Sequence, residues 1–213
     1  MKKTKLLMFS GGLDSTYLLY KYVNSNEDIW VHHVILKNKQ QNRWKEELKA
    51  SREIISYMKK IRDFTYTESE WSMCIDENDI SRMIWDGDVN AFVAGQIVPY
   101  IKSDEITLIF GRIMEDDLMQ SSIDHLKYTR MVWRAATEKF RHKTLPEFET
   151  PLRFKQKRDL VKELPDELLD LIWVCLYPID ENKPCNKCKS CIQLENAKRG
   201  IFEGKVLYKP INK

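Results

Sequence analysis

The chain reads Ser10-Gly11-Gly12-Leu13-Asp14-Ser15-Thr16 directly behind the apolar run Leu6-Leu7-Met8-Phe9, and a helix-like segment follows at residues 17–23. This order predicts a buried strand, then a turn of small residues, then a helix. Such a turn presents free backbone N–H groups and the positive end of a helix dipole at one point. The stretch therefore predicts an α/β fold with a phosphate-binding site after its first strand.

Each residue type in this turn suits an anion. The two glycines let the backbone bend and approach an anion closely, and the hydroxyl side chains add donors to the backbone amides. Asp14 stands at the start of the helix, where it caps the first turn or helps to hold a cation. The candidate cofactor-binding residues are Ser10, Gly11, Gly12, Asp14, Ser15 and Thr16, and we take Asp14 and Ser15 also as candidate catalytic residues.

The pattern of this turn is neither G-x-x-x-x-G-K-[ST] nor G-x-G-x-x-G, which excludes the common nucleotide loops. It resembles the SGGxDS pyrophosphate loop of the PP-loop ATP pyrophosphatase superfamily. The resemblance implies a Rossmann-like fold of the adenine nucleotide alpha hydrolase type, with a parallel sheet and helices on both faces. It also implies an enzyme that adenylates a carboxylate or carbonyl oxygen and releases pyrophosphate. The alternative is a glycine-rich turn without a ligand.

Length and charge limit the class of protein. A chain of 213 residues suits one large α/β domain. Its 35 basic and 32 acidic residues argue against duplex nucleic acid as a partner and fit a small anionic ligand. The apolar run behind the N-terminal lysines is too short for a signal peptide, and no stretch is long enough to span a membrane. We expect a cytosolic (cytoplasmic) protein without a membrane partner.

The rest of the pattern alternates between strands and helices. Strands are expected at 29–36, 64–67 and 105–110, and helices at 46–58, 80–101, 124–140, 155–164 and 165–174. Pro165 is expected at the first position of the last of these helices. We assign residues 1–174 to an ATP-binding α/β domain and residues 175–213 to a zinc-binding motif and tail packed on it.

Further candidates follow the later elements. Gly111 and Asp116 come after the strand at 105–110, at the sheet edge that also holds the first loop, where a cation that bridges phosphates would lie. An acidic cap on the following helix is the alternative. Lys157, or its neighbours Lys155 and Arg158, is expected to reach the phosphates.

Four cysteines follow the pattern C-x9-C-x2-C-x2-C, at Cys175, Cys185, Cys188 and Cys191. Two overlapping C-x-x-C turns and one upstream thiolate supply a closed set of four sulfur ligands, which suits structural zinc. An iron–sulfur cluster is the alternative, although the C-x3-C-P continuation of the bacterial cluster run is missing. Cys74 stands alone and is expected to be a small buried residue.

Together, the loop and the four cysteines resemble one family, the 7-cyano-7-deazaguanine synthases (QueC). Residues 42–50 are similar to its Gly-Gln-Arg…Glu-Leu-x-Ala stretch, which adds Arg43 to the candidate cofactor-binding residues. Residues 150–157 are similar to its Thr-Pro-Leu segment and the lysine that follows, which makes Lys157 a candidate catalytic residue.

The family resemblance implies a ligase that uses ATP and Mg²⁺ to adenylate 7-carboxy-7-deazaguanine. Ammonia then displaces AMP to give the amide, and a second activation gives the nitrile, 7-cyano-7-deazaguanine (preQ0), for queuosine biosynthesis or DNA modification. Zinc braces the fold, and the resemblance suggests a homodimer.

Alternative functions remain because residues 121–130 lack the proline and cysteine of the family's Gly-Tyr-Pro-Asp-Cys-Arg segment. The enzyme can stop at the amide or act on another carboxylate, such as a protein terminus in a defence system. A tRNA-modifying sulfur transferase would want a catalytic cysteine pair, and only Cys74 lies outside the zinc set. Basic residues beside the cysteines suggest a non-enzymatic nucleic-acid module, although we expect no stable nucleic-acid partner. These basic residues are Lys183, Lys187, Lys189, Lys198 and Arg199.

Overall fold

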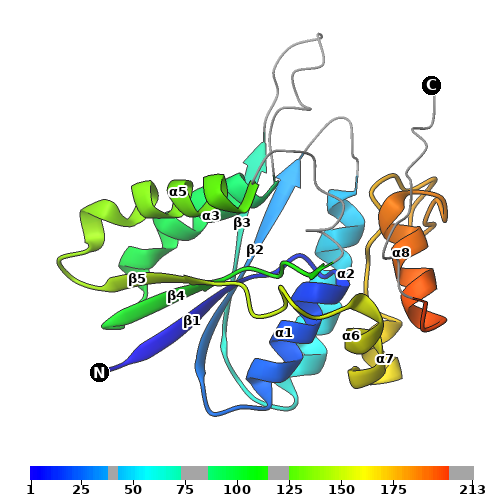
Figure 1. Ribbon diagram of the computed structural model, residues 1–213, viewed down its shortest axis with the longest axis horizontal. Coiled ribbons are helices and arrows are strands. Elements are labelled where there is room, and N and C mark those ends of the chain that lie inside the picture. Colours follow the sequence, from blue (N-terminus) through cyan, green and yellow to red (C-terminus); the bar gives the residue numbers. More distant parts are fainter. Residues whose placement is uncertain (38–42, 73–85, 115–124, 202–213) are drawn as a thin grey trace, which may run out of the picture.

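The computed structural model describes residues 1–37, 43–72, 86–114 and 125–201. In this part of the chain five strands form one parallel sheet in the order β3-β2-β1-β4-β5 (Figure 1). The predicted α/β fold with a parallel sheet is therefore confirmed. The strands are β1 (Lys3–Met8), β2 (Asp28–Lys37), β3 (Thr65–Ser72), β4 (Glu105–Ile109) and β5 (Leu145–Glu149).

Helices cover both faces of the sheet, as predicted. One face carries α1 (Leu13–Val23), α2 (Trp44–Lys59), α6 (Lys157–Glu163) and α7 (Asp166–Leu169), and the other carries α3 (Asp86–Ile97) and α5 (His125–Thr137) (Figure 1). Successive residues of a strand point to opposite faces, so Leu7 enters the first core and Leu6 the second. Burial on both faces explains why the first strand is apolar throughout its second half.

The strand order reverses at β1. β2 and β3 lie on one side of β1, and β4 and β5 lie on the other. Ligands of open α/β sheets bind in the crevice at the carboxyl ends of the strands where the order reverses. The turn at residues 10–16 and Gly111 follow the two strands that flank this point.

Two strands at the sheet edges differ from the sequence-based expectation. The strand expected at 64–67 extends to Ser72, because the polar residues after Thr67 pair through their backbone with β2. β5 is a full strand parallel to β4, at a place where the sequence pattern predicted no strand. Edge strands are half exposed, so their side chains lack the apolar signal that identifies a buried strand.

Proline changes the ends of two expected helices. Within the described residues, the helix expected at 80–101 is α-helical over Asp86–Ile97 and then tightens into the 3-10 turn η2 (Val98–Tyr100) around Pro99. Pro165 is the N-cap residue of α7, not its first helical residue. The helix expected at 124–140 likewise ends in a 3-10 turn, η3 (Glu138–Phe140).

Helices α3 and α5 pack in close contact through a glycine. A Cβ atom at Gly95 would lie 2.3 Å from the Cβ of Ala136. Only glycine therefore permits this approach, which holds the second core together around the fully buried Trp133.

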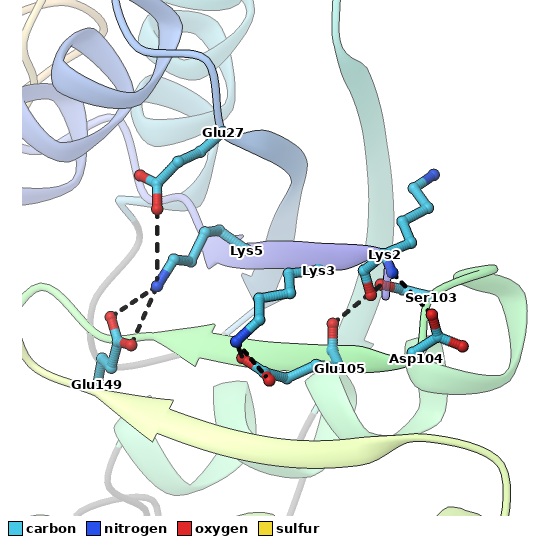
Figure 2. A network of polar contacts seen from close by, with 8 residues as sticks. All are labelled: Lys2, Lys3, Lys5, Glu27, Ser103, Asp104, Glu105 and Glu149. Atoms are coloured by element: carbon cyan, nitrogen blue, oxygen red, sulfur yellow. Dashed lines mark hydrogen bonds and ion pairs between the residues drawn. The ribbon is translucent and has the colours of Figure 1, made fainter.

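Ion pairs fix the amino-terminal part of β1 against its neighbours (Figure 2). Lys3 Nζ lies 2.8 Å from Glu105 on β4, and Lys5 Nζ lies 2.9 Å from Glu149 on β5 and 3.9 Å from Glu27. Partly exposed pairs of this kind stabilise by about 0–1 kcal/mol each. They neutralise the N-terminal lysines and match the register of the three strands. In the described part of the chain, no helix is long and apolar enough to cross a membrane.

Candidate functional site

The turn after β1 has the geometry of an anion-binding loop. Gly12 is the N-cap residue of α1, and its N–H lies 3.3 Å from Ser10 Oγ. The hydroxyl of Ser15 lies 3.1 Å from that of Ser10 and donates to the Gly12 carbonyl at 3.3 Å. Two hydroxyl groups therefore lie together at the amino end of a helix, where the dipole favours negative charge.

Gly11 supplies the conformation of this loop. Its φ is +74°, and a Cβ atom there would lie 2.8 Å from Ser51 Oγ and 3.1 Å from the Ser51 backbone nitrogen on α2. A side chain would be strained in the backbone and would also collide with α2. Gly11 therefore lies under the loop against α2.

A cavity of about 530 Å³ opens at the carboxyl ends of β1 and β4. Its walls come from the loop and the beginnings of α1, α2, α3 and α6, together with α8 (Lys189–Lys198). The structure brings seven of the predicted cofactor-binding and catalytic residues to this cavity. They are Ser10, Gly12, Asp14, Ser15, Arg43, Gly111 and Lys157.

The remaining predicted residues that the structure describes do not line the cavity. Thr16 is fully buried in α1, and Gly11 supports the loop from beneath. Lys155 contacts Tyr17 and Glu163, at 2.7 and 3.0 Å, whereas Lys157 reaches the cavity. Asp116, together with the rest of the acidic stretch at 115–117, lies outside the described residues.

An arginine and two acids form one wall of the cavity. Arg43 Nε lies 3.0 Å from Glu47 Oε1, four residues along α2, and the Arg43 guanidinium also pairs with Asp86 at the start of α3. Burial raises the pKa of the Glu47 carboxyl to about 7, against the lowering effect of Arg43. The two remaining carboxylates nearby, on Asp86 and Glu46, raise this pKa further.

Lysines from the second half of the chain enter the same cavity. Lys157 Nζ donates to Gln193 Oε1 at 2.7 Å, which connects the first turn of α6 to α8. Lys189, the first residue of α8, also lines the cavity. The positive side chains and the amino end of α1 together suit a polyanionic ligand such as a nucleoside triphosphate.

The four cysteines come together as predicted. Their Sγ atoms all lie within 4.8 Å of one another, and all four residues are buried. A tetrahedral zinc ion at about 2.3 Å from each sulfur would place the sulfurs roughly 3.8 Å apart, so this donor set fits a single ion. Cys188 Sγ and Cys191 Sγ already lie 3.4 Å apart.

Backbone N–H groups donate to two of the cysteine sulfurs and favour the thiolate form of Cys185. Cys188 N–H donates to Cys185 Sγ at 3.3 Å, and Cys185 N–H donates to Cys175 Sγ at 3.2 Å. Burial raises the pKa of the Cys185 thiol, but the backbone N–H groups of Lys187 and Cys188 outweigh it and lower this pKa to about 7. Hydrogen bonds to the sulfur are typical of cysteines that bind metal.

Trp173 connects the cysteine cluster to the loop. Its backbone N–H donates to the Gly11 carbonyl at 3.0 Å, and its indole N–H donates to the Cys175 carbonyl at 3.1 Å. The indole ring packs against the cysteines, and Trp173 also lines the cavity. The two candidate sites are therefore in direct contact.

The chain combines a parallel α/β sheet with a cluster of four cysteines near the end of the described residues. By sequence it matches no family model and no curated protein. Among solved structures it is similar to "U34-tRNA thiolase NcsA from Methanococcus maripaludis with its [4Fe-4S] cluster", with a TM-score of 0.51 and 14% sequence identity. The match covers 93% of this chain but 64% of that chain, so this chain spans less than two thirds of the neighbour. At this identity the likeness shows the fold alone, and it does not test the resemblance of the sequence to the 7-cyano-7-deazaguanine synthases.

Several cavity residues had no assigned role in the sequence. Glu47 carries a local signal, because it follows Arg43 at the i, i+4 spacing that joins side chains on one helix face. Asp86, Trp173 and Gln193 reach the cavity only through tertiary packing, and no local pattern indicates them.

Proposed function

We propose that this chain is an ATP-dependent ligase that adenylates the carboxylate of 7-carboxy-7-deazaguanine. The enzyme then converts the acyl adenylate with ammonia to the amide, and converts the amide to 7-cyano-7-deazaguanine. The observation that carries this proposal is the cavity in which the loop at the start of α1 meets Lys157 and Lys189. A phosphate-binding loop and two lysines on one cavity suit ATP. The identity of the acceptor, 7-carboxy-7-deazaguanine, is inferred from the resemblance of the sequence to the 7-cyano-7-deazaguanine synthases.

In this proposal the loop binds the β- and γ-phosphates. Backbone N–H groups at the start of α1 and the hydroxyls of Ser10 and Ser15 donate to phosphate oxygens, while Lys157 balances charge as pyrophosphate leaves. Gln193 orients the Lys157 ammonium group through their 2.7 Å contact. The Asp14 carboxylate on the cavity wall would help to hold a Mg²⁺ ion, which would offset phosphate charge when bound.

The first chemical step joins a carboxylate oxygen of the acceptor to the α-phosphorus and breaks the bond to pyrophosphate. Ammonia then forms a C–N bond with the activated carbonyl carbon, and AMP leaves with the electron pair of the C–O bond. The amide oxygen is activated in the same way before elimination to the nitrile. Alignment of both reactants in one cavity contributes much of the rate.

We assign zinc to the four cysteines as a structural metal. A single ion touches all four sulfurs, whereas a [4Fe-4S] cluster places each thiolate on a different iron and so holds the sulfurs farther apart. The compact arrangement of the sulfurs, all within 4.8 Å of one another, supports the single ion. Metal analysis of native protein that finds iron and sulfide in place of zinc would contradict this assignment.

A second candidate function is ATP-dependent tRNA thiolation, which the likeness to NcsA favours. In that case the four cysteines would hold a [4Fe-4S] cluster, the group that the NcsA structure contains. The short distances between the four sulfur atoms argue against a cluster. The fifth cysteine of the sequence, Cys74, lies outside the described residues.

The test is an assay of pyrophosphate release with Mg-ATP and either 7-carboxy-7-deazaguanine or unmodified tRNA. We expect release that depends on the deazaguanine acid and disappears in the Asp14→Ala and Ser15→Ala variants. Release that depends only on tRNA would favour thiolation. Unchanged ATP consumption in folded Asp14→Ala and Ser15→Ala proteins would show that the loop does not bind the phosphates.

A further inference from the structure

We propose that Glu47 is the general base of the amide-forming step and takes a proton from the nitrogen of the attacking ammonia. This inference rests on the proposed function and assigns a role that the loop, the lysines and the cysteines do not fill.

The position of Glu47 suits a base in this cavity. Glu47 lines the same cavity as the loop and Lys157. Its side chain is 16% exposed, so the carboxylate is mostly removed from bulk water but reaches the cavity. Its backbone carbonyl would lie 3.3 Å from a Cβ atom at Gly11, which shows how closely this turn of α2 approaches the loop.

The charge of this wall suits a nitrogen nucleophile. The carboxylates of Glu47 and Asp86 share the single guanidinium of Arg43, so one negative charge is left over when both acids are ionised. This excess negative charge attracts a nitrogen nucleophile, because nitrogen becomes positively charged as it attacks a carbonyl carbon.

Arg43 also fixes the geometry of the base. It binds Glu47 Oε1 at 3.0 Å, while Asp86 holds the guanidinium from α3. The carboxylate is thereby oriented, with Oε2 as a second acceptor atom. A general base needs such positioning within hydrogen-bond reach of the proton that it removes.

The charged groups that act on Glu47 come from both helices beside it: Arg43 and Glu46 on α2 and Asp86 on α3. Tyr177 acts on Arg43 in turn. Burial, Asp86 and Glu46 together outweigh Arg43 and raise the pKa of Glu47 to about 7. A base is most effective when its pKa lies near the working pH, which this value meets.

The proposed step balances. Ammonia forms a C–N bond with the carbonyl carbon of the acyl adenylate, and its nitrogen becomes positively charged. The Glu47 carboxylate accepts one proton from this nitrogen. The C–O bond to AMP then breaks, and AMP leaves with the electron pair. The products are the amide, AMP and protonated Glu47, which returns its proton to solvent.

The experiment compares wild type with Glu47→Gln, and with Glu53→Gln as a control at an exposed position on the same helix. Each protein is assayed for exchange of pyrophosphate into ATP with 7-carboxy-7-deazaguanine, which reports adenylation alone. Each is then assayed for amide formation with ammonium and for hydroxamate formation with hydroxylamine. Hydroxylamine is a weaker base than ammonia, so its adduct loses a proton readily without catalytic help.

We expect Glu47→Gln to keep pyrophosphate exchange, to lose about 10²-fold in amide formation and to retain hydroxamate formation. At a fixed concentration of free ammonia, amide formation by wild type should rise with pH through about 7, following the pKa of Glu47, and the variant should lack this rise. Glu53→Gln should match wild type throughout.

Three outcomes overturn the inference. The first is an unchanged rate of amide formation in Glu47→Gln, and the second is an equal loss of rate with ammonia and with hydroxylamine. The third is a loss of pyrophosphate exchange, because that would place Glu47 in the adenylation step. Failure of the proposed function looks different, because wild type itself would then show no exchange that depends on the deazaguanine acid.

Discussion

The backbone N–H of Trp173 donates to the carbonyl of Gly11 at 3.0 Å. This hydrogen bond joins the segment that leads into the four cysteines to the loop that follows β1. The indole N–H of the same residue holds the Cys175 carbonyl. Residues beside the cysteines, among them Trp173 and Lys189, therefore form part of the cavity wall.

Metal removal should weaken nucleotide binding. Cys188 is the N-cap residue of α8 and Cys191 lies within the helix, so loss of the metal releases the helix that supplies Lys189 and Gln193 to the cavity. We expect chelated protein, or the Cys188→Ser/Cys191→Ser double variant, to bind ATP at least about tenfold more weakly, as measured by calorimetry. Equal ATP affinity of the metal-free and metal-loaded proteins would contradict the coupling.

Gly11→Ala should destabilise the protein more than Gly200→Ala. Both glycines have φ of +74°, so alanine carries the same backbone strain of about 1–2 kcal/mol at each. At Gly11 the added Cβ also meets Ser51 at 2.8 Å, whereas nothing lies within 4 Å at Gly200. We expect an additional loss of about 1–3 kcal/mol for Gly11→Ala in urea unfolding. Equal losses would show that α2 does not press against the loop.

Gly95→Ala should also be destabilising, although alanine favours helices by roughly 1 kcal/mol over glycine. The new Cβ would lie 2.3 Å from that of Ala136, which forces α3 and α5 apart. We expect a net loss of about 1–3 kcal/mol in the free energy of unfolding. Adding Ala136→Gly should restore much of the loss, and a double variant no more stable than Gly95→Ala would count against this contact.

The stability of the protein should depend on pH through Glu47. Its pKa rises from the ordinary 4.5 to about 7 on folding, so the folded state holds a proton that the unfolded state has lost. This effect destabilises the fold as the pH rises from about 4.5 to 7 and is complete above 7. Glu47→Gln should therefore be more stable than wild type at pH 8, by about 1–3 kcal/mol in urea unfolding, and the difference should shrink at pH 5. A constant difference at both values would contradict the raised pKa.

Local patterns in the sequence predicted the main features of the fold and the position of the site. The turn at residues 10–16 combines strand, small-residue turn and helix within one short stretch, so local reasoning located the cavity. The same reasoning assigned Thr16 to the ligand, yet Thr16 lies one helical turn after Leu13 on the buried face of α1. Spacing within the turn does not report which face of the helix a hydroxyl occupies.

Other features depend on contacts between distant residues. Lys157 and Lys155 are two residues apart and carry the same charge. Lys155 donates hydrogen bonds to Tyr17 and Glu163, whereas Lys157 donates to Gln193 on α8. Trp173 joins the cysteines to Gly11 through its indole N–H and its backbone N–H, and both bonds end on backbone carbonyls that residue type does not indicate. β3 and β5 pair at the sheet edges with half-exposed side chains, so their length follows from pairing with a neighbouring strand.

The most direct test of the central claim is a mass-spectrometric product assay with purified, metal-loaded protein, 7-carboxy-7-deazaguanine, Mg-ATP and ammonium. We predict AMP and pyrophosphate together with the nitrile, with the amide as an intermediate. Amide without nitrile would indicate an enzyme that completes only the first activation. Folded protein that forms neither product and no acyl adenylate would contradict the assignment of the deazaguanine acid as the acceptor.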